Sequence, residues 1–178
     1  RQMSFAKEKN LIVYFSHAGE NYSGGKTIYL SVGNTKRVAE ILKEQTGCQT
    51  WELETVTPYP AGYQALSELA QKEQRNASRP RLSAYPQSLE GYEGIFLGYP
   101  IWWGTVPMAV LTFLEKYNWQ HLRLYPFCTH EGSGLGRSLK DITAACRQAE
   151  IMSGLAVRGA EAMSAQAEVR NWLSKVLA

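Results

Sequence analysis

The chain has 178 residues, of which 44% are hydrophobic and 20% are charged, and its formal net charge is +3. This length and composition suit one globular domain, so we expect a single domain over residues 1–178. Lysine and arginine are scattered rather than clustered, which argues against a nucleic-acid partner, and no stretch reaches the roughly 20 apolar residues of a membrane span.

The chain opens with a polar segment, residues 1–9, which we expect to be a flexible tail. It lacks the apolar core of a signal peptide, which indicates a cytoplasmic protein or one whose leader has been removed. A short apolar run over 11–15 predicts a strand that is covered on both faces. An amphipathic pattern then predicts a helix over 35–45, alternation predicts a second strand over 50–55, and a polar helix is expected over 63–75.

A loop with two prolines, residues 76–90, separates this half of the chain from a second half with the same alternation. The elements predicted there are a strand over 94–98, a helix that opens at Pro107, a strand over 123–128, a helix over 138–148 capped by Ser138, a strand over 151–157 and a helix over 165–177. Regular alternation of strands and helices is typical of an α/β fold with a parallel sheet and helices on both faces.

Several chemistries are disfavoured by what the sequence lacks. Cys48, Cys128 and Cys146 are far apart and form no Cys-x-x-Cys pair, so we expect buried thiols rather than disulfides or a zinc site, and no metal. Asp141 is the only aspartate, which argues against the acidic cluster of a phosphoryl receiver. The chain also has no GxSxG elbow of a serine hydrolase.

In an open parallel sheet, ligands bind beyond the carboxyl ends of the strands. The loop after the first predicted strand begins at Ser16 and leads, after a long excursion, to Gly33, Asn34 and Thr35 at the start of a helix. Hydroxyl groups and free N–H groups at a helix N-terminus bind phosphate. Neither GxxxxGK[ST] nor GxGxxG is present, so no ATP-type loop or dinucleotide fingerprint is expected. A capped helix without a ligand is the alternative.

Two further loops at this edge carry unusual residues. Trp102 and Trp103 are adjacent in a short loop, and stacking on a planar aromatic ligand accounts for the pair, with a core anchor or a partner surface as the alternative. The loop over 129–134 combines small residues with polar tips that can approach the edge of such a ligand, although a flexible connection has the same composition. His130 is a candidate proton donor or a structural histidine.

The chain resembles the flavodoxin family from about residue 10 to residue 177. The matching segments are LIVYFSHAGENY, VGNTKRVAE, IFLGYPIWWGTVP, YPFCTHEGSGLGRS and VRNWLSKVL. The resemblance implies a flavodoxin-like α/β fold: a doubly wound three-layer sandwich whose five-stranded parallel sheet has the order 2-1-3-4-5. It also implies flavin mononucleotide (FMN) as the cofactor, bound at the ends of strands 1, 3 and 4.

The resemblance assigns a role to each of the three loops. The phosphate of FMN is expected to contact Ser16, Ala18, Gly33, Asn34 and Thr35. The flavin ring is expected beside Tyr99, Pro100, Ile101, Trp102, Trp103 and Gly104. The other edge of the ring is expected along Thr129, His130, Glu131, Gly132 and Ser133.

Two features depart from the usual flavodoxin pattern. The family keeps the phosphate loop compact, as S-x-[ST]-G-N-T, whereas residues 20–32 intervene here, and we expect 26–30 to form a small hairpin or flap. Electron-carrying flavodoxins are strongly acidic, which steers them to basic redox partners, whereas this chain is mildly basic.

The resemblance implies an FMN-binding redox protein that transfers electrons to a partner protein or to a small acceptor. The alternative is an NAD(P)H-dependent FMN oxidoreductase that acts on quinones or similar acceptors. The sequence leaves open which of the two applies, and therefore whether the chain is an enzyme, and it leaves the oligomeric state open as well.

Overall fold

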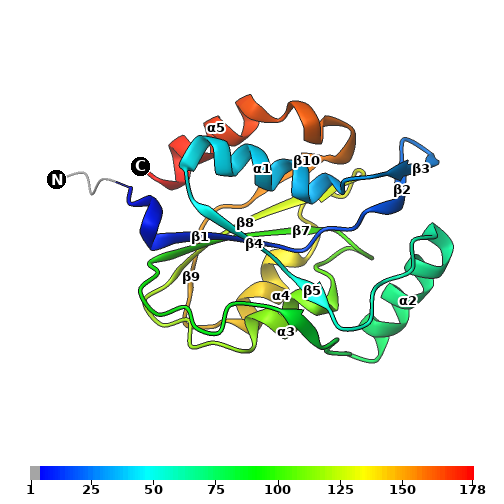
Figure 1. The fold of residues 1–178 in the computed structure, drawn as a ribbon, viewed down its shortest axis with the longest axis horizontal. Coiled ribbons are helices and arrows are strands. Elements are labelled where there is room, and N and C mark those ends of the chain that lie inside the picture. Colours follow the sequence, from blue (N-terminus) through cyan, green and yellow to red (C-terminus); the bar gives the residue numbers. More distant parts are fainter. Residues whose placement is uncertain (1–4) are drawn as a thin grey trace.

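A parallel sheet forms the middle layer of the protein in the computed structural model, which describes residues 5–178 (Figure 1). Its strands lie in the order β10-β8-β7-β1-β4, and β9 also pairs with β8. The strands are β1 (Asn10–Tyr14), β4 (Gln49–Glu52), β7 (Gly94–Pro100), β8 (Arg123–His130), β9 (Glu150–Ile151) and β10 (Leu155–Arg158). Read from β4 and numbered in chain order, with β9 and β10 as two pieces of the fifth strand, the order is 2-1-3-4-5. The predicted α/β fold and strand order are therefore confirmed.

Helices cover both faces of the sheet (Figure 1). On one face lie α1 (Asn34–Thr46) and α5 (Gln166–Val176), and on the other lie α3 (Met108–Leu114) and α4 (Ser138–Ala145). The remaining helix, α2 (Tyr63–Arg75), stands near the carboxyl ends of the strands. Within residues 5–178, none of the helices has the length and apolar character needed to cross a membrane.

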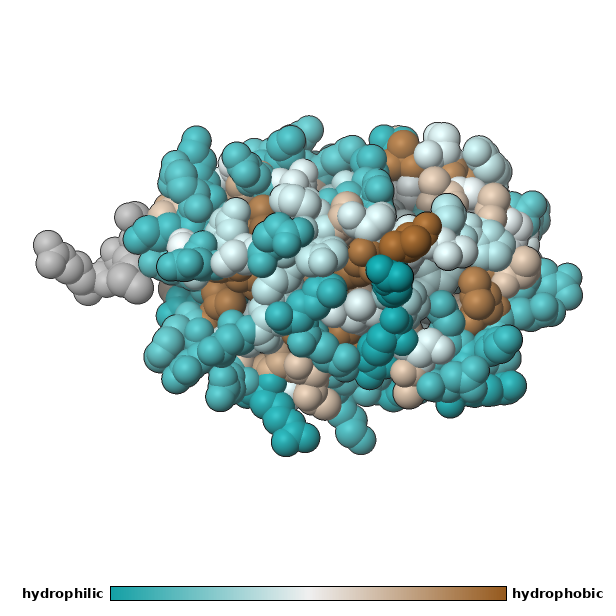
Figure 2. Space-filling view, turned by 60° about the horizontal axis from the view of Figure 1, so that its bottom comes forward, coloured by the Kyte–Doolittle hydropathy of each residue, from teal (hydrophilic) through white to brown (hydrophobic). Residues whose placement is uncertain are grey.

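The side chains of β1 show how the sheet separates two cores. Successive residues of a strand point to opposite faces. Accordingly Leu11 and Val13 pack on the side of α3 and α4, whereas Ile12 and Tyr14 pack on the side of α1 and α5. All four are buried, because helices cover both faces. On the face that bears α3 and α4, exposed hydrophobic residues lie in separate places among hydrophilic ones (Figure 2).

A hairpin and a short strand pair lie outside the main sheet. β2 (Gly19–Ser23) and β3 (Lys26–Leu30) form an antiparallel hairpin, so the segment predicted over 26–30 is the second strand of a hairpin that starts at Gly19. The predicted loop over 76–90 contains β6 (Leu82–Ala84), which pairs antiparallel with β5 (Glu54–Thr55). The predicted strand over 50–55 is therefore divided between two sheets, and Leu53 separates the two parts.

Two predictions about the helix over 138–148 are wrong. The helix ends at Ala145, because Cys146 has φ −136° and ψ 62°, which is not a helical conformation. Ser138 does not cap the helix either, because it is a fully buried helical residue and Arg137 is at the N-cap. Its hydroxyl group instead forms a hydrogen bond of 2.9 Å with the hydroxyl group of Tyr99.

The start of the chain is described only in part. Residues 1–4 of the predicted tail lie outside the described residues. Lys7–Lys9 form the 3-10 turn η1, and Phe5 packs edge-on against Phe96 with 6.5 Å between the ring centroids.

We predict that Phe96→Ala lowers the free energy of unfolding by about 3–5 kcal/mol. Phe96 is fully buried, stacks on Tyr125 at 4.6 Å and meets Trp172 edge-on at 5.9 Å, so truncation leaves a cavity between the sheet and α5. Urea unfolding measures the change. The control is Tyr29→Ala on the hairpin, where the side chain is 73% exposed and a change within about 0.5 kcal/mol is expected. Equal losses in both variants would contradict this description of the core.

Candidate functional site

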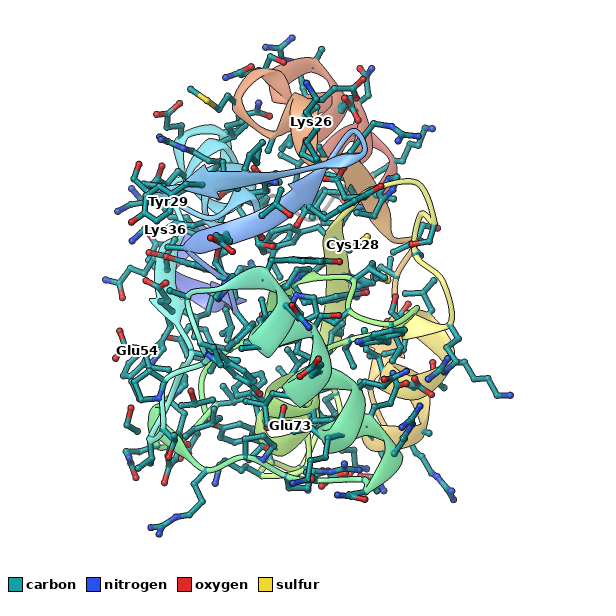
Figure 3. The ribbon with its side chains drawn as sticks, turned by 90° about the vertical axis from the view of Figure 1, so that its right-hand side faces the viewer. Lys26, Tyr29, Lys36, Glu54, Glu73 and Cys128 are labelled. Carbon is teal, nitrogen blue, oxygen red and sulfur yellow. The ribbon has the colours of Figure 1, made fainter. Side chains whose placement is uncertain are left out.

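A cavity of about 400 Å³ opens at the carboxyl ends of β1, β7 and β8, between the hairpin and α2. We call it the carboxyl-end cavity. Figure 3 looks onto this end of the sheet, with the hairpin crossing above and α2 in front. The volume is in the range of small-molecule sites, and the position is where open α/β sheets bind ligands.

Residues from all three predicted loops line the carboxyl-end cavity. Those among the predicted site residues are Asn34, Thr35, Pro100, Ile101, Trp102, Trp103, Gly104, Thr129, His130, Glu131, Gly132 and Ser133. Four other predicted residues do not line it: Ser16, Ala18, Gly33 and Tyr99. Of these, Ser16 and Gly33 pack against each other where the start of α1 meets the end of β1. Tyr99 is fully buried, and its hydroxyl group forms a hydrogen bond with that of Ser138.

Sequence reasoning missed the residues that close the cavity from the hairpin and from α2. The additional lining residues are His17, Asn21, Tyr22, Tyr63, Leu66, Ser67 and Ala70. Nothing in the local sequence marks the α2 residues as part of a binding site, since Leu66 and Ala70 have the spacing of an ordinary buried helix face. His17 could have been recognised from the sequence, because it lies between Ser16 and Ala18, which are both predicted site residues.

The start of α1 is fixed tightly against the end of β1. A Cβ atom on Gly33 would overlap Ser16 Oγ and would lie 2.7 Å from the carbonyl oxygen of His17, so only glycine allows this approach. Ser16 Oγ accepts a hydrogen bond of 3.1 Å from the N–H group of Lys36. The earlier N–H groups of the helix have no partner within it, so those of Asn34 and Thr35 are suited to bind an anion.

A second contact joins α1 to β8. Thr35 Oγ1 and Thr129 Oγ1 are 2.8 Å apart, and both side chains are buried at the base of the cavity. Either hydroxyl group can be the donor. The pair therefore holds the N-terminus of α1 beside the loop that follows β8.

Trp102 belongs to a cluster of aromatic rings that meet edge to face. Its ring centroid lies 5.1 Å from that of Tyr59, 5.3 Å from that of Phe15 and 6.1 Å from that of His17. Tyr59 donates a hydrogen bond of 2.7 Å to Glu73 on α2. The cluster thus ties the tryptophan to both β1 and α2, which fixes one wall of the cavity.

Trp103 turns away from this cluster toward α2. Its φ angle is +50°, its side chain is 47% exposed, and its Nε1–H group donates a hydrogen bond of 2.9 Å to the carbonyl oxygen of Ser67. Its own carbonyl oxygen accepts a hydrogen bond of 3.2 Å from Gln74. The two tryptophans therefore have different surroundings, although both line the cavity.

The last residue of β8 and the loop that follows it bring titratable groups to the rim of the cavity. His130 Nδ1 accepts a hydrogen bond of 2.9 Å from the N–H group of Gly132, so a neutral ring carries its proton on Nε2. Burial, together with the charge of Arg158, lowers the pKa of His130. Burial raises the pKa of Glu131, and the Gly24 N–H group and Arg158 oppose this rise.

Metal-ligating and thiol groups are the other reactive side chains among residues 5–178. No group of three or more His, Cys, Asp and Glu side chains there is arranged to hold a metal ion. Burial raises the pKa of Cys128 to about 12, so this thiol stays protonated at neutral pH and is not a nucleophile. In Figure 3, Cys128 lies below the hairpin, and the residue is buried on β8.

Comparison with known families identifies the chain. The model of a family described as flavodoxin matches residues 26–176. The chain belongs to the flavodoxin family. The match begins at β3 and runs to the end of α5, so it covers most of the strands and helices described above. No curated protein matches the sequence.

Solved structures share the fold of this flavodoxin-family chain at low sequence identity. A candidate flavoprotein of Bacteroides eggerthii is 23% identical, with a TM-score of 0.74 and coverage of 96% of this chain and 98% of that one. One of Bacteroides uniformis is also 23% identical, with a TM-score of 0.75 and coverage of 95% and 99%. A Lactobacillus acidophilus flavoprotein in complex with FMN is 21% identical, with a TM-score of 0.67 and coverage of 93% and 98%.

We predict that Glu73→Gln removes part of the pH dependence of stability. Burial raises the pKa of Glu73 above its ordinary value of 4.5, although the hydrogen bond from Tyr59 opposes this rise. A carboxyl group with a raised pKa in the folded state stabilises the protein fully below about pH 4, and this contribution is lost as the pH rises through the folded-state value. Glutamine accepts the same hydrogen bond from Tyr59 without ionising.

Relative to the wild type, Glu73→Gln should therefore gain stability as the pH rises above about 4. Urea unfolding at several pH values measures this difference. The exposed Glu44→Gln is the control, for which we expect the wild-type profile. A variant that loses stability against the wild type as the pH rises would contradict the environment described for Glu73.

Proposed function

We propose that this chain binds FMN in the carboxyl-end cavity and transfers electrons as a flavodoxin-type carrier. The observation that carries the proposal is that the N-terminus of α1 and the aromatic wall around Trp102 open into one cavity. FMN combines a phosphate group and a planar aromatic ring in one molecule, so it needs both environments within its length. Family membership and the FMN complex of the Lactobacillus acidophilus protein support the same choice.

The residues present fit a flavin nucleotide. Free N–H groups at Asn34 and Thr35 are suited to the phosphate, and the close approach of Gly33 to Ser16 keeps side-chain atoms out of that corner. A buried nitrogen atom of His17, Nε2, has no hydrogen-bond partner within the described residues, and His17 lines the same cavity. We assign the phosphate to this end of the cavity.

The ring of the flavin would lie between the loop after β7 and the loop after β8. Trp102 and Trp103 supply aromatic surface, and Gly104 leaves space beside them. On the other edge, His130 and the backbone over 131–133 supply polar groups. When bound, FMN supplies the redox chemistry, and the protein contributes binding, orientation and local electrostatics.

A second candidate is an NAD(P)H-dependent FMN oxidoreductase that acts on quinones or similar acceptors. The net charge of +3 favours it, because electron carriers of this family use acidic surfaces to steer toward basic partners. The two candidates differ in their electron donor, which is a protein for the carrier and a nicotinamide nucleotide for the oxidoreductase.

Visible absorption of the FMN-loaded protein separates these possibilities. We expect flavin bands that dithionite bleaches and that NADH and NADPH leave unchanged over minutes. Rapid bleaching by either nucleotide would contradict the carrier and support the oxidoreductase. A protein that stays colourless after addition of FMN and gel filtration would contradict both.

We predict that Trp103→Ala weakens FMN binding by about 1–3 kcal/mol, because an exposed tryptophan in this loop is available to pack on the flavin. Trp103→Phe should retain part of the affinity, since it keeps an aromatic ring but loses the hydrogen bond to Ser67. Isothermal titration of the apoprotein with FMN measures both. The control is Trp51→Ala on β4, whose side chain is 39% exposed and does not line the cavity. Unchanged affinity in Trp103→Ala would exclude the contact.

A further inference from the structure

His17 has an unusual environment. It is the third residue after β1, only 9% of its surface is exposed, and its Nε2 atom is buried without a hydrogen-bond partner among residues 5–178. A buried polar atom that lacks a hydrogen-bond partner destabilises a folded protein. Such an atom in a cavity-lining residue indicates that the partner comes from a ligand.

The neighbours of His17 show which part of the cavity it lines. Its carbonyl oxygen lies against Gly33 at the start of α1, and its ring meets Trp102 edge-on at 6.1 Å. His17 therefore contacts the start of α1 through its backbone and the aromatic wall through its ring. In a bound flavin nucleotide, the group between the phosphate and the ring is the ribityl chain, which carries hydroxyl groups.

The other residues of this loop have no buried side-chain atom that lacks a hydrogen-bond partner. Ser16 Oγ already accepts the N–H group of Lys36, and Ala18 has no polar atom. Asn21 is directed to the backbone, because its Nδ2 atom donates to the carbonyl oxygens of His17 and Gly19. Within residues 16–18, the imidazole of His17 is thus the side chain that has a buried hydrogen-bonding atom without a partner.

We propose that His17 Nε2 hydrogen-bonds the ribityl phosphate chain of the bound flavin nucleotide and so acts as a ligand-positioning residue. This proposal rests on the FMN site proposed above. Burial lowers the pKa of His17, although a hydrogen bond with the backbone of Glu20 opposes this change, so the neutral ring is favoured. A neutral ring has one donor and one acceptor nitrogen. Either nitrogen state can pair with a ribityl hydroxyl group, and the donor state can pair with a phosphate oxygen.

The test compares two substitutions of His17 by isothermal titration of the apoprotein with FMN. His17→Phe keeps the planar shape against Trp102 and removes the nitrogen atoms, so we expect the Kd for FMN to rise about tenfold. His17→Gln places an amide group near the position of Nε2, so we expect a Kd within about threefold of the wild type. His121→Phe, at an exposed histidine near the opposite ends of the strands, is the control and should bind as the wild type does.

Thermal unfolding of the apoproteins provides a readout that separates binding from structure. Since His17→Phe removes an unsatisfied buried nitrogen, its unfolding midpoint without FMN should equal or exceed that of the wild type. A structural histidine with satisfied nitrogen atoms would give the opposite result.

Titration with riboflavin locates the contact. An equal loss of affinity for riboflavin and FMN points to the ribityl hydroxyl groups, and a loss of affinity for FMN alone points to the phosphate.

Two results would overturn the assignment. One is a His17→Phe variant that binds FMN as tightly as the wild type. The other is equal weakening in His17→Phe and His17→Gln, which would show that shape rather than the nitrogen atom matters. Failure of the wild-type protein to bind FMN is seen before any variant is made, and it would remove the proposed site together with this assignment.

Discussion

The close packing of Gly33 against the Ser16–His17 peptide is the constraint on which the site depends. It brings the start of α1 back to the end of β1 after the hairpin β2–β3 has left the sheet. Without it, the free N–H groups of the helix would not face the same cavity as Trp102 and the loop after β8. Any side chain at Gly33 would push the helix away from Ser16 and would also disturb the hydrogen bond between Lys36 and Ser16.

The hairpin and α2 change what this site can recognise. In a site without them, the ends of the strands would be open, whereas here Tyr22 and Tyr63 close one side, with their rings 6.0 Å apart. The carboxylate of Glu131 lies near Asn34 at the η2 turn (Gly159–Ser164), since a Cβ atom on Gly159 would meet both side chains. A negative charge there opposes the binding of a phosphate dianion, and burial raises the pKa of Glu131.

The sequence was sufficient to predict the sheet and most helices because hydrophobic periodicity determines which faces are buried. The bounds predicted for α2, 63–75, agree with the structure, and the apolar runs at β1 and β7 were recognised without ambiguity. The errors occurred where contacts between residues far apart in the sequence determine the local structure. Ser138 resembles a helix cap in sequence, yet its hydroxyl group pairs with Tyr99, a residue 39 positions away.

The site was predictable to the extent that it lies in loops after strands. The three loops converge because parallel strands place their carboxyl ends together. The contributions of Ser67 and Ala70 were not predictable, since the position of α2 over the cavity depends on the contacts of Tyr59 and Trp103 with that helix. The different surroundings of Trp102 and Trp103 could not be inferred either, because a φ angle of +50° is unusual for tryptophan.

Hydrogen–deuterium exchange of the protein with and without excess FMN tests the central claim most directly, because it reports both binding and location. We expect slower exchange of the amides over 33–36, 101–104 and 129–133, which surround the carboxyl-end cavity. The amides near a second cavity of about 410 Å³ at the opposite end, which Phe5, His121 and Glu150 line, should be unaffected. Unchanged exchange throughout, or slowing only at that second cavity, would contradict the account.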